Sequence, residues 1–188
     1  MAPSLSPEAV LGATGRQLLL DLARASIRHG VEAGTPLPVE LALLPPALAR
    51  PRATFVTLRR WGELRGCTGR LEATRPLARD VADNAFAAAF LDSRFPPLRA
   101  RDLEDLEVSI SILTRLRPLE FACEADLVRR LVPGRDGLVL CAGALRATFL
   151  PSVWKELPDP WEFLRELKLK TGCRRIGRAL RYRALQIP

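Results

Sequence analysis

Two strand-like segments separated by a short turn most strongly constrain what this chain can fold into. Residues 53–58 have the sequence Ala-Thr-Phe-Val-Thr-Leu, and a second segment returns at residues 64–71 after the turn 59–63. A connection this short allows only antiparallel pairing, because parallel strands need a crossover of about a dozen residues or more. Glycines at 66 and 69 interrupt the second arm. The pattern therefore predicts a β-hairpin with irregular backbone on one arm.

Further strands and helices follow from periodicity and from turn residues. Residues 107–113 alternate between apolar and hydroxyl side chains, which is typical of a strand with one buried and one polar face. A second hairpin is expected from residues 138–141 and 144–150, and a final strand from residues 182–187. Capping residues and apolar spacing predict helices beginning at Ser6-Pro7-Glu8 and spanning residues 14–30 or 14–34, 74–92, 121–131 and 159–171. Helices placed between hairpins indicate an α+β fold with mostly antiparallel sheets, not a doubly wound parallel sheet.

Length and hydropathy bound the domain organisation. The chain has 188 residues, of which 48% are hydrophobic, enough for one sizeable core but not for two independent large domains. We therefore expect one domain over residues 1–188, with room for two lobes within it. No apolar run reaches the roughly 18 residues that cross a bilayer, and the N-terminus has no basic and apolar leader segment. These features predict a soluble, cytoplasmic protein with no membrane segment.

The cysteines and the single histidine exclude several kinds of chemistry. The cysteines lie far apart in the sequence, so no zinc site, redox pair or disulfide is indicated; they are Cys67, Cys123, Cys141 and Cys173. His29 stands near the end of an amphipathic helix, and nothing places it beside a nucleophile. No glycine-rich nucleotide loop is present either. The sequence therefore predicts no bound metal and no cofactor.

The charge of the chain admits a nucleic-acid interpretation without requiring it. The formal net charge is +8, and only Lys155, Lys168 and Lys170 among the 29 basic residues are lysines. Such a preference for arginine over lysine is typical of a compositional bias of the whole genome. Most of the arginines are also interleaved with Asp and Glu along the chain. The C-terminal segment differs because its arginines have no acidic neighbour in sequence: Arg174, Arg175, Arg178, Arg181 and Arg183. A nucleic-acid-binding module that uses Arg174, Arg175, Arg178 and Arg181 is therefore one alternative function.

The segment Leu64-Arg65-Gly66-Cys67-Thr68-Gly69 is the leading candidate for a functional centre. If it forms a tight turn, glycines permit positive φ and close approach of the backbone, so that N–H groups at Gly66 and Gly69 could hold an anion. Arg65 would add a permanent cation for a carboxylate or phosphate. Cys67 would be either a nucleophile or part of the wall. Spacing alone equally allows a strained hairpin with an inward-facing cysteine.

Other candidates lie farther along the chain. Asp92 and Arg94 flank a predicted helix end, where they could pair structurally or line a cleft with Asp92 as a general base. Ser109, on the polar face of the strand 107–113, is a candidate ligand contact or a solvated side chain. Trp61, at the hairpin tip, could be an exposed contact residue, which would favour a non-catalytic protein-interaction adaptor.

The segment Leu64-Arg65-Gly66-Cys67-Thr68-Gly69 also resembles the hallmark of the AMMECR family, Leu-Arg-Gly-Cys-Ile-Gly. Other blocks agree with that family in order and spacing over nearly the whole chain. They are the Ala-rich helix before Asp92-Ser93-Arg94-Phe95-Pro96, the strand 107–111, the turn 134–138, the block 149–154, and the helix with Phe163-Leu164 that ends at 170–172. Two residues depart from the family pattern, Thr68 in place of Ile and Ser152 in place of Gln.

The resemblance implies more about fold than about function. It implies a two-lobed α+β fold, and it assigns Arg65, Gly66, Cys67 and Gly69 to the family signature, with Asp92, Arg94 and Ser109 among its recurrent positions. Microbial members of the family look like partners of a radical S-adenosylmethionine enzyme and a dioxygenase-like protein. We therefore expect a pocket-bearing enzyme or a substrate-presenting subunit that acts with such a system.

Overall fold

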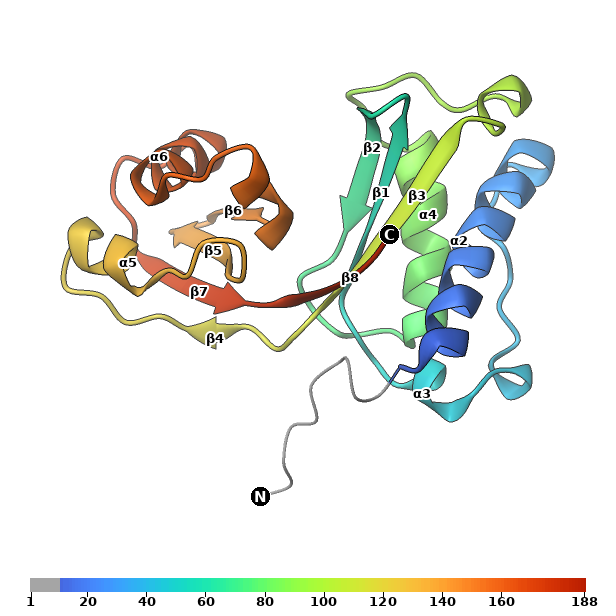
Figure 1. Ribbon diagram of the computed structural model, residues 1–188, viewed down its shortest axis with the longest axis horizontal. Coiled ribbons are helices and arrows are strands. Elements are labelled where there is room, and N and C mark those ends of the chain that lie inside the picture. Colours follow the sequence, from blue (N-terminus) through green and yellow to red (C-terminus); the bar gives the residue numbers. More distant parts are fainter. Residues whose placement is uncertain (1–10) are drawn as a thin grey trace. The chain divides into compact units, whose positions relative to one another are not determined.

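The computed structural model describes residues 11–188, so the helix start expected at Ser6-Pro7-Glu8 lies outside the described residues. The chain divides into two compact units. The first extends to Leu113 and includes Leu185–Pro188, and the second comprises Thr114–Ala184. Each unit has a four-stranded antiparallel sheet and its own helices (Figure 1). The α+β fold with mostly antiparallel sheets is thereby confirmed.

The first unit places two long helices on one face of a sheet whose strand order is β2-β1-β3-β8 (Figure 1). The helices are α2 (Ala13–Ala33) and α4 (Leu77–Phe90), with the short α3 (Pro46–Ala49) beside them. The strands are β1 (Thr54–Arg60), β2 (Glu63–Gly69), β3 (Leu106–Leu113) and β8 (Ala184–Ile187). Within residues 11–188 the unit also contains two single-turn 3-10 helices, η1 (Leu41–Leu43) and η2 (Ala100–Asp102).

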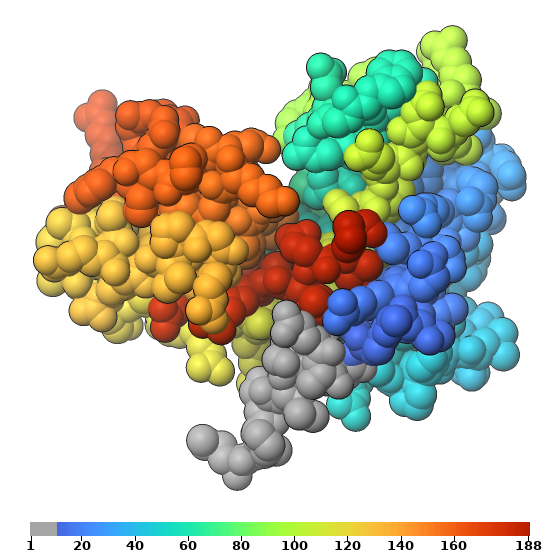
Figure 2. All heavy atoms as spheres, in the orientation of Figure 1, coloured from blue at the N-terminus to red at the C-terminus, as the bar shows by residue number. Residues whose placement is uncertain are grey.

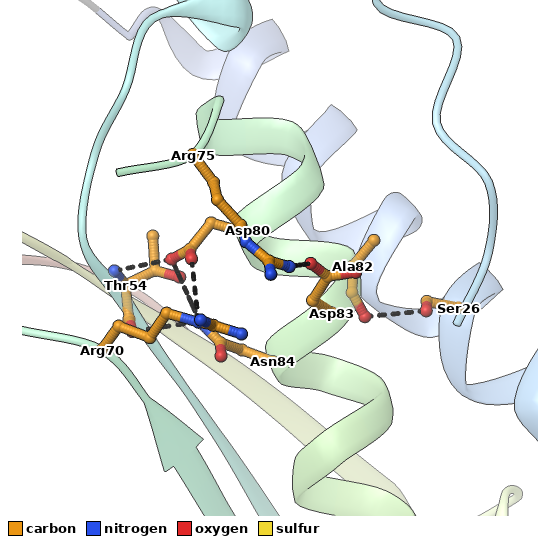
Figure 3. A network of polar contacts seen from close by, with 8 residues as sticks. All are labelled: Ser26, Thr54, Arg70, Arg75, Asp80, Ala82, Asp83 and Asn84. Carbon is orange, nitrogen blue, oxygen red and sulfur yellow. Dashed lines mark hydrogen bonds and ion pairs between the residues drawn. The ribbon is translucent and has the colours of Figure 1, made fainter. Parts of the chain in front are cut away.

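The core of this unit follows the two-residue period of its strands. Val56 and Leu58 on β1 and Ile110 and Ile112 on β3 are buried in the cluster that includes residues of α2 and α4. Their alternation confirms the buried face expected for the strand 107–113, although Ser111, on the opposite face, is also buried, and its hydroxyl accepts a 2.9 Å hydrogen bond from Gln186. Small residues allow α2 and α4 to approach closely, as where the Ser26 hydroxyl donates to the Ala82 carbonyl at 2.8 Å (Figure 3).

Helix α4 holds the β1–β2 hairpin through residues spaced four apart, which lie on one face of a helix. Asp80 accepts hydrogen bonds from the Thr54 N–H at 3.0 Å and from its hydroxyl at 2.6 Å, and Asn84 donates to the Thr54 carbonyl (Figure 3). Ala88 packs against Gly66, and Asp92 continues the spacing just beyond the helix. A buried polar stripe therefore fixes the hairpin on the helix.

The second unit orders its strands β4-β7-β5-β6. These are β4 (Arg117–Pro118), β5 (Gly137–Ala142), β6 (Leu145–Phe149) and β7 (Arg178–Tyr182). Its helices are α5 (Glu124–Arg130), η3 (Pro151–Lys155) and α6 (Pro160–Thr171). As expected, the Asp159 side chain caps α6 by accepting from the Glu162 N–H at 2.8 Å, and Gly172 ends it in the left-handed conformation. Phe163, fully buried, stacks on the Trp154 ring at a centroid distance of 3.8 Å.

Three expectations from the sequence were wrong in detail. The segment 64–69 is a strand, as expected for the second arm of the hairpin, and the alternative of a tight turn was wrong, because every residue of the segment except Arg65 is paired with β1. Helix α4 begins at Leu77, since Pro76 is in an extended conformation and acts as the N-cap. The final strand is two strands in different sheets, because Thr114 hydrogen bonds both the N–H and the carbonyl of Arg183 and separates β7 from β8.

Candidate functional site

The candidate site lies on β2, which is an edge strand of the first sheet. Its register with β1 shifts by one residue: Leu58 pairs with Gly66, whereas Arg59 pairs with Leu64. Arg65 is therefore the extra residue of a β-bulge, a device that bends a strand and changes the direction of a side chain. The irregular backbone expected on this arm of the hairpin is confirmed, and its physical cause is this bulge.

The two glycines of β2 serve packing, and the alternative of a tight turn with positive φ was wrong. Neither Gly66 nor Gly69 has a positive φ. A Cβ atom on Gly66 would collide with the carbonyl oxygen of Ala88 in α4, and one on Gly69 would collide with the Phe55 ring. Close approach of the backbone was therefore the correct reason for glycine at both positions.

The outward-facing backbone of Cys67 is bound by two side chains from the loop after α4. The Cys67 N–H donates to Asp92 Oδ2 at 2.9 Å, and Arg94 Nη2 donates to the Cys67 carbonyl oxygen at 3.3 Å. An edge strand normally leaves such groups to solvent or to another chain. Asp92 and Arg94 thus take the place of a neighbouring strand and fix the position of Cys67.

Asp92 and Arg94 also pair with each other through both carboxylate oxygens. Arg94 Nη2 lies 2.7 Å from Asp92 Oδ2, and Arg94 Nε lies 2.9 Å from Asp92 Oδ1. The hydrogen bond from Arg94, together with the bond from the Cys67 N–H, lowers the pKa of Asp92 to about 2. A carboxylate with such a low pKa is a weak base at neutral pH. Of the two alternatives that spacing allowed, the geometry favours structural pairing over general-base catalysis.

Arg65 presents a cation whose hydrogen-bonding capacity is only partly used. Its Nη2 donates to the Pro96 carbonyl at 2.6 Å, and its guanidinium carbon lies 5.8 Å from the centroid of the Phe95 ring. Among the residues that the structure describes, its buried Nη1 has no hydrogen-bond partner. Arg94 approaches the same ring at 5.4 Å. Two cations therefore flank Phe95 at the edge of β2.

The side chain of Cys67 belongs to a polar row across three strands, since Thr57 pairs with both Cys67 and Ser109. The Thr57 hydroxyl lies 3.4 Å from the Cys67 sulfur, and the Ser109 hydroxyl donates to the Thr57 carbonyl at 3.5 Å. The chain's one histidine, His29, is on α2 and pairs with Thr35 at 3.4 Å. Residues 11–188 contain no group of acidic, histidine and cysteine side chains suited to a metal. The row offers hydrogen bonds to a ligand but no general base for Cys67.

Trp61 lies at the tip of the β1–β2 hairpin and is 73% exposed. Trp61 has a φ of 54°, a left-handed conformation that is unfavourable for a bulky side chain. Arg60 stacks on its ring at 4.2 Å and pairs with Asp102 at 2.7 Å. In Figure 2 the hairpin atoms and those of the segment containing η2 lie next to each other. The exposure of Trp61 agrees with the expectation of a contact residue.

The C-terminal arginines do not act as one group. All of Arg174, Arg175, Arg178 and Arg181 are exposed, as nucleic-acid binding would require. Arg181, however, lies 4.0 Å from the buried carboxylate of Asp136, an acidic neighbour that sequence distance concealed. Arg175 and Arg178 line a cavity of the second unit, whereas Arg174 does not. The structure therefore separates residues that the sequence placed together.

Sequence reasoning missed the buried polar cluster at the base of the hairpin. Asp80 and Asn84 are 1% and 2% exposed, and the Arg70 guanidinium lies 3.7 Å from Asp80 (Figure 3). Burial raises the pKa of Asp80, because desolvation outweighs the hydrogen bonds from Thr54 and the charge of Arg70. The available signal was the four-residue spacing of two polar residues within an otherwise apolar helix. Since Arg70 directly follows β2, this cluster fixes one end of the candidate strand.

Comparisons with known proteins agree with the architecture described above. The AMMECR1 family model matches residues 20–187. A protein of Methanothermobacter thermautotrophicus is 39% identical over 130 residues, which cover 69% of this chain and 68% of the relative. A protein of Thermofilum pendens is 35% identical over 175 residues, with coverages of 87% and 82%. The crystal structure of the uncharacterized protein PH0010 from Pyrococcus horikoshii superimposes with a TM-score of 0.87 at 28% identity, covering 94% of this chain and 92% of that one.

No helix within residues 11–188 combines the length and the apolar character needed to cross a membrane.

Proposed function

This chain belongs to the AMMECR1 family, and on that premise we propose that it is a ligand-presenting subunit that holds an oxyanion at Arg65. The observation that carries the proposal is the buried Nη1 of Arg65, which has no hydrogen-bond partner among the described residues. Burying a donor of a charged group without an acceptor costs about 1–3 kcal/mol or more. A carboxylate or phosphate oxygen placed against Nη1 would remove that cost.

The surroundings of Arg65 support an anchoring role over a covalent one. The bond from Nη2 to Pro96 fixes the guanidinium, so less side-chain freedom would be lost when an anion binds. Arg94 cannot replace Arg65, because Asp92 already neutralises it. Cys67 has a hydroxyl neighbour and no base, which favours a wall contact over a nucleophile. Ser109 and Thr57 would supply further hydrogen bonds along the polar row.

Inorganic phosphate is the probe for this proposal, and the Cys67 thiol is the reporter. We expect millimolar phosphate to slow alkylation of Cys67 by iodoacetamide, as measured by peptide mass spectrometry. Arg65→Gln should weaken this protection about tenfold, since a hydrogen bond to a charged group contributes about 1.5–3 kcal/mol. Arg79→Gln, which changes an exposed arginine on α4, is the matched control. Absence of protection, or equal protection in the Arg65→Gln variant, would refute the anchor.

The hairpin tip favours a second function, docking of a partner protein. Tryptophan and arginine are both enriched among the residues that contribute most of the binding energy at protein interfaces. We propose that Trp61 contacts the radical S-adenosylmethionine enzyme or the dioxygenase-like protein implied by the family resemblance. Such a partner would receive the ligand that Arg65 holds.

Co-expression with each candidate partner, followed by gel filtration, tests this docking role. Trp61→Ala should reduce the affinity by at least about thirtyfold, as expected for the loss of a hot-spot residue worth about 2 kcal/mol. Trp161→Ala is the control, because Trp161 is also exposed but belongs to α6. A complex that survives Trp61→Ala, or the lack of any complex, would contradict the docking role. Neither result would bear on the oxyanion site, which the phosphate experiment tests.

A further inference from the structure

A cavity of about 370 Å³ lies entirely within the second unit and shares no residue with the Arg65 site. Two chain segments form it, residues 119–124 and residues 175–179. They are paired at one end, where the Leu119 N–H donates to the Ala179 carbonyl at 3.0 Å. Beyond that bond the two segments separate. The first leads into α5, which begins at Glu124, and in the second the Gly177 N–H donates to the Cys141 carbonyl at 3.0 Å. The volume is within the range of small-molecule sites, about 300–1,000 Å³.

The lining combines an apolar part with cations that have no ion pair. Leu119, Ile176 and Ala179 are buried, and Phe121 is half-buried. Arg175 and Arg178 are exposed, and neither forms an ion pair within residues 11–188. Of the two acidic residues in the lining, Glu124 is paired with Lys168 at 2.6 Å. Glu120, the other acidic residue, has no ion pair within residues 11–188, so the lining contains two arginines and one carboxylate without ion pairs.

We propose that this cavity binds a small molecule that carries an oxyanion on an apolar body. Arg175 and Arg178 would bind the carboxylate or phosphate, since the guanidinium fork matches the geometry of both groups. Phe121 and the buried aliphatic residues would contact the apolar part. A nucleic acid would use exposed cations whether or not they line a cavity, so it would engage Arg174 as strongly as Arg175. The division of the arginines by the cavity favours the small ligand.

Cys123 makes the proposal testable, because its thiol is exposed and lines the cavity. The probes are phenyl phosphate and benzoate, which separate the two oxyanions, and benzyl alcohol is the uncharged control. We expect one anionic probe to slow iodoacetamide alkylation of Cys123 several-fold and benzyl alcohol to have no effect. Arg175→Gln and Arg178→Gln should each weaken that protection about tenfold. Arg65→Gln should leave it unchanged, which distinguishes this cavity from the site on β2.

Arg174→Gln is the matched control, since Arg174 precedes Arg175 and lies outside the lining. In the Arg174→Gln variant the anionic probe should protect Cys123 as strongly as in the wild type. The proposal is wrong if neither anionic probe protects Cys123. It is also wrong if Arg174→Gln is as harmful as Arg175→Gln while single-stranded RNA protects Cys123 with a steep salt dependence, the outcome expected of a nucleic-acid surface.

Discussion

The β1–β2 hairpin of the first unit and the β5–β6 hairpin of the second differ in how a following helix holds them. Helix α4 contacts β1 through the buried polar side chains of Asp80 and Asn84. Helix α6 packs through aromatic contacts, with Phe163 against Phe149 at the end of β6 and against Trp154 of η3. Polar contacts are directional, and a buried donor or acceptor without its partner is costly. The first arrangement therefore fixes a strand more precisely than the second.

The turns of the two hairpins also differ, in the number of residues with positive φ and in the type of residue that occupies those positions. At Gly143-Ala144 only the glycine has a positive φ, which costs little. At Trp61-Gly62 both residues do, so a tryptophan occupies a position where Asn or Gly is preferred. Local strain of this kind is concentrated at functional sites. Together with the buried polar contacts, it supports the proposed roles of Arg65 and Trp61 on the β1–β2 hairpin.

The largest effect is expected from the aromatic packing of the second unit. Phe163→Ala removes a fully buried ring that contacts two other aromatic residues. We expect the free energy of unfolding to fall by about 3–5 kcal/mol. Chemical denaturation followed by circular dichroism would measure the loss, which should be the same at pH 7 and pH 5 because no titratable group is involved. A loss below about 1 kcal/mol would show that the β5–β6 hairpin and helix α6 do not depend on this aromatic packing.

A slightly smaller loss is expected from Gly66→Ala in the first unit. The added methyl group would collide with the Ala88 carbonyl, which belongs to a helix backbone and cannot rotate away. Forcing the strand from the helix should cost about 3 kcal/mol and should also expose Cys67 to faster alkylation. Gly12→Ala is the control, because nothing lies within 4 Å of its Cβ position, and it should cost less than about 1 kcal/mol. Equal stability of the two variants would contradict the close contact between β2 and α4.

A pH-dependent loss is expected from the clamp on β2. The folded-state pKa of Asp92, about 2, lies below its ordinary value of 3.8, so its stabilisation is fully present above about pH 5 and is lost as the pH falls through the folded-state pKa to about pH 1. Asp92→Asn should reduce the free energy of unfolding by roughly 1 kcal/mol above about pH 5, allowing for solvent screening. The wild type and the variant should converge at about pH 1, below both pKa values. A difference between them that stays constant from pH 6 to pH 2 would exclude this ionic contribution.

The smallest effect is a gain in stability. Trp61→Asn replaces tryptophan by a residue that tolerates the left-handed conformation of this turn. The free energy of unfolding should therefore rise by about 1 kcal/mol. Tm measured by differential scanning calorimetry would report the change, with Trp161→Asn as the control on exposed tryptophan. If the proposed docking is correct, the same variant binds its partner more weakly. A loss of stability would mean that contacts of the indole, such as that with Arg60, outweigh the backbone strain.

Much of the fold was predictable because short-range patterns decide it. The alternation in β3 and the Asp159 cap with Gly172 at the ends of α6 depend on neighbours within a few residues. The division of residues 182–187 between two sheets was not predictable, since it depends on Thr114, a residue distant in sequence. The polar stripe of α4 was overlooked although its spacing was visible, because Asp80 and Asn84 are of types usually found at a surface.

For the candidate site, the sequence by itself determined which residues are available: a glycine-framed arginine and cysteine, one histidine and dispersed thiols. It also indicated that the two glycines permit close approach of the backbone, which the contacts with Ala88 and Phe55 bear out. Only the tertiary structure decided their roles. Asp92 is an ionised clamp, because its carboxylate meets Arg94 and Cys67. Arg65 retains a buried Nη1 without a hydrogen-bond partner among the described residues, because its hydrogen bond to Pro96 uses Nη2. Long-range contacts fix hydrogen-bond partners, and those partners determine what each side chain can do.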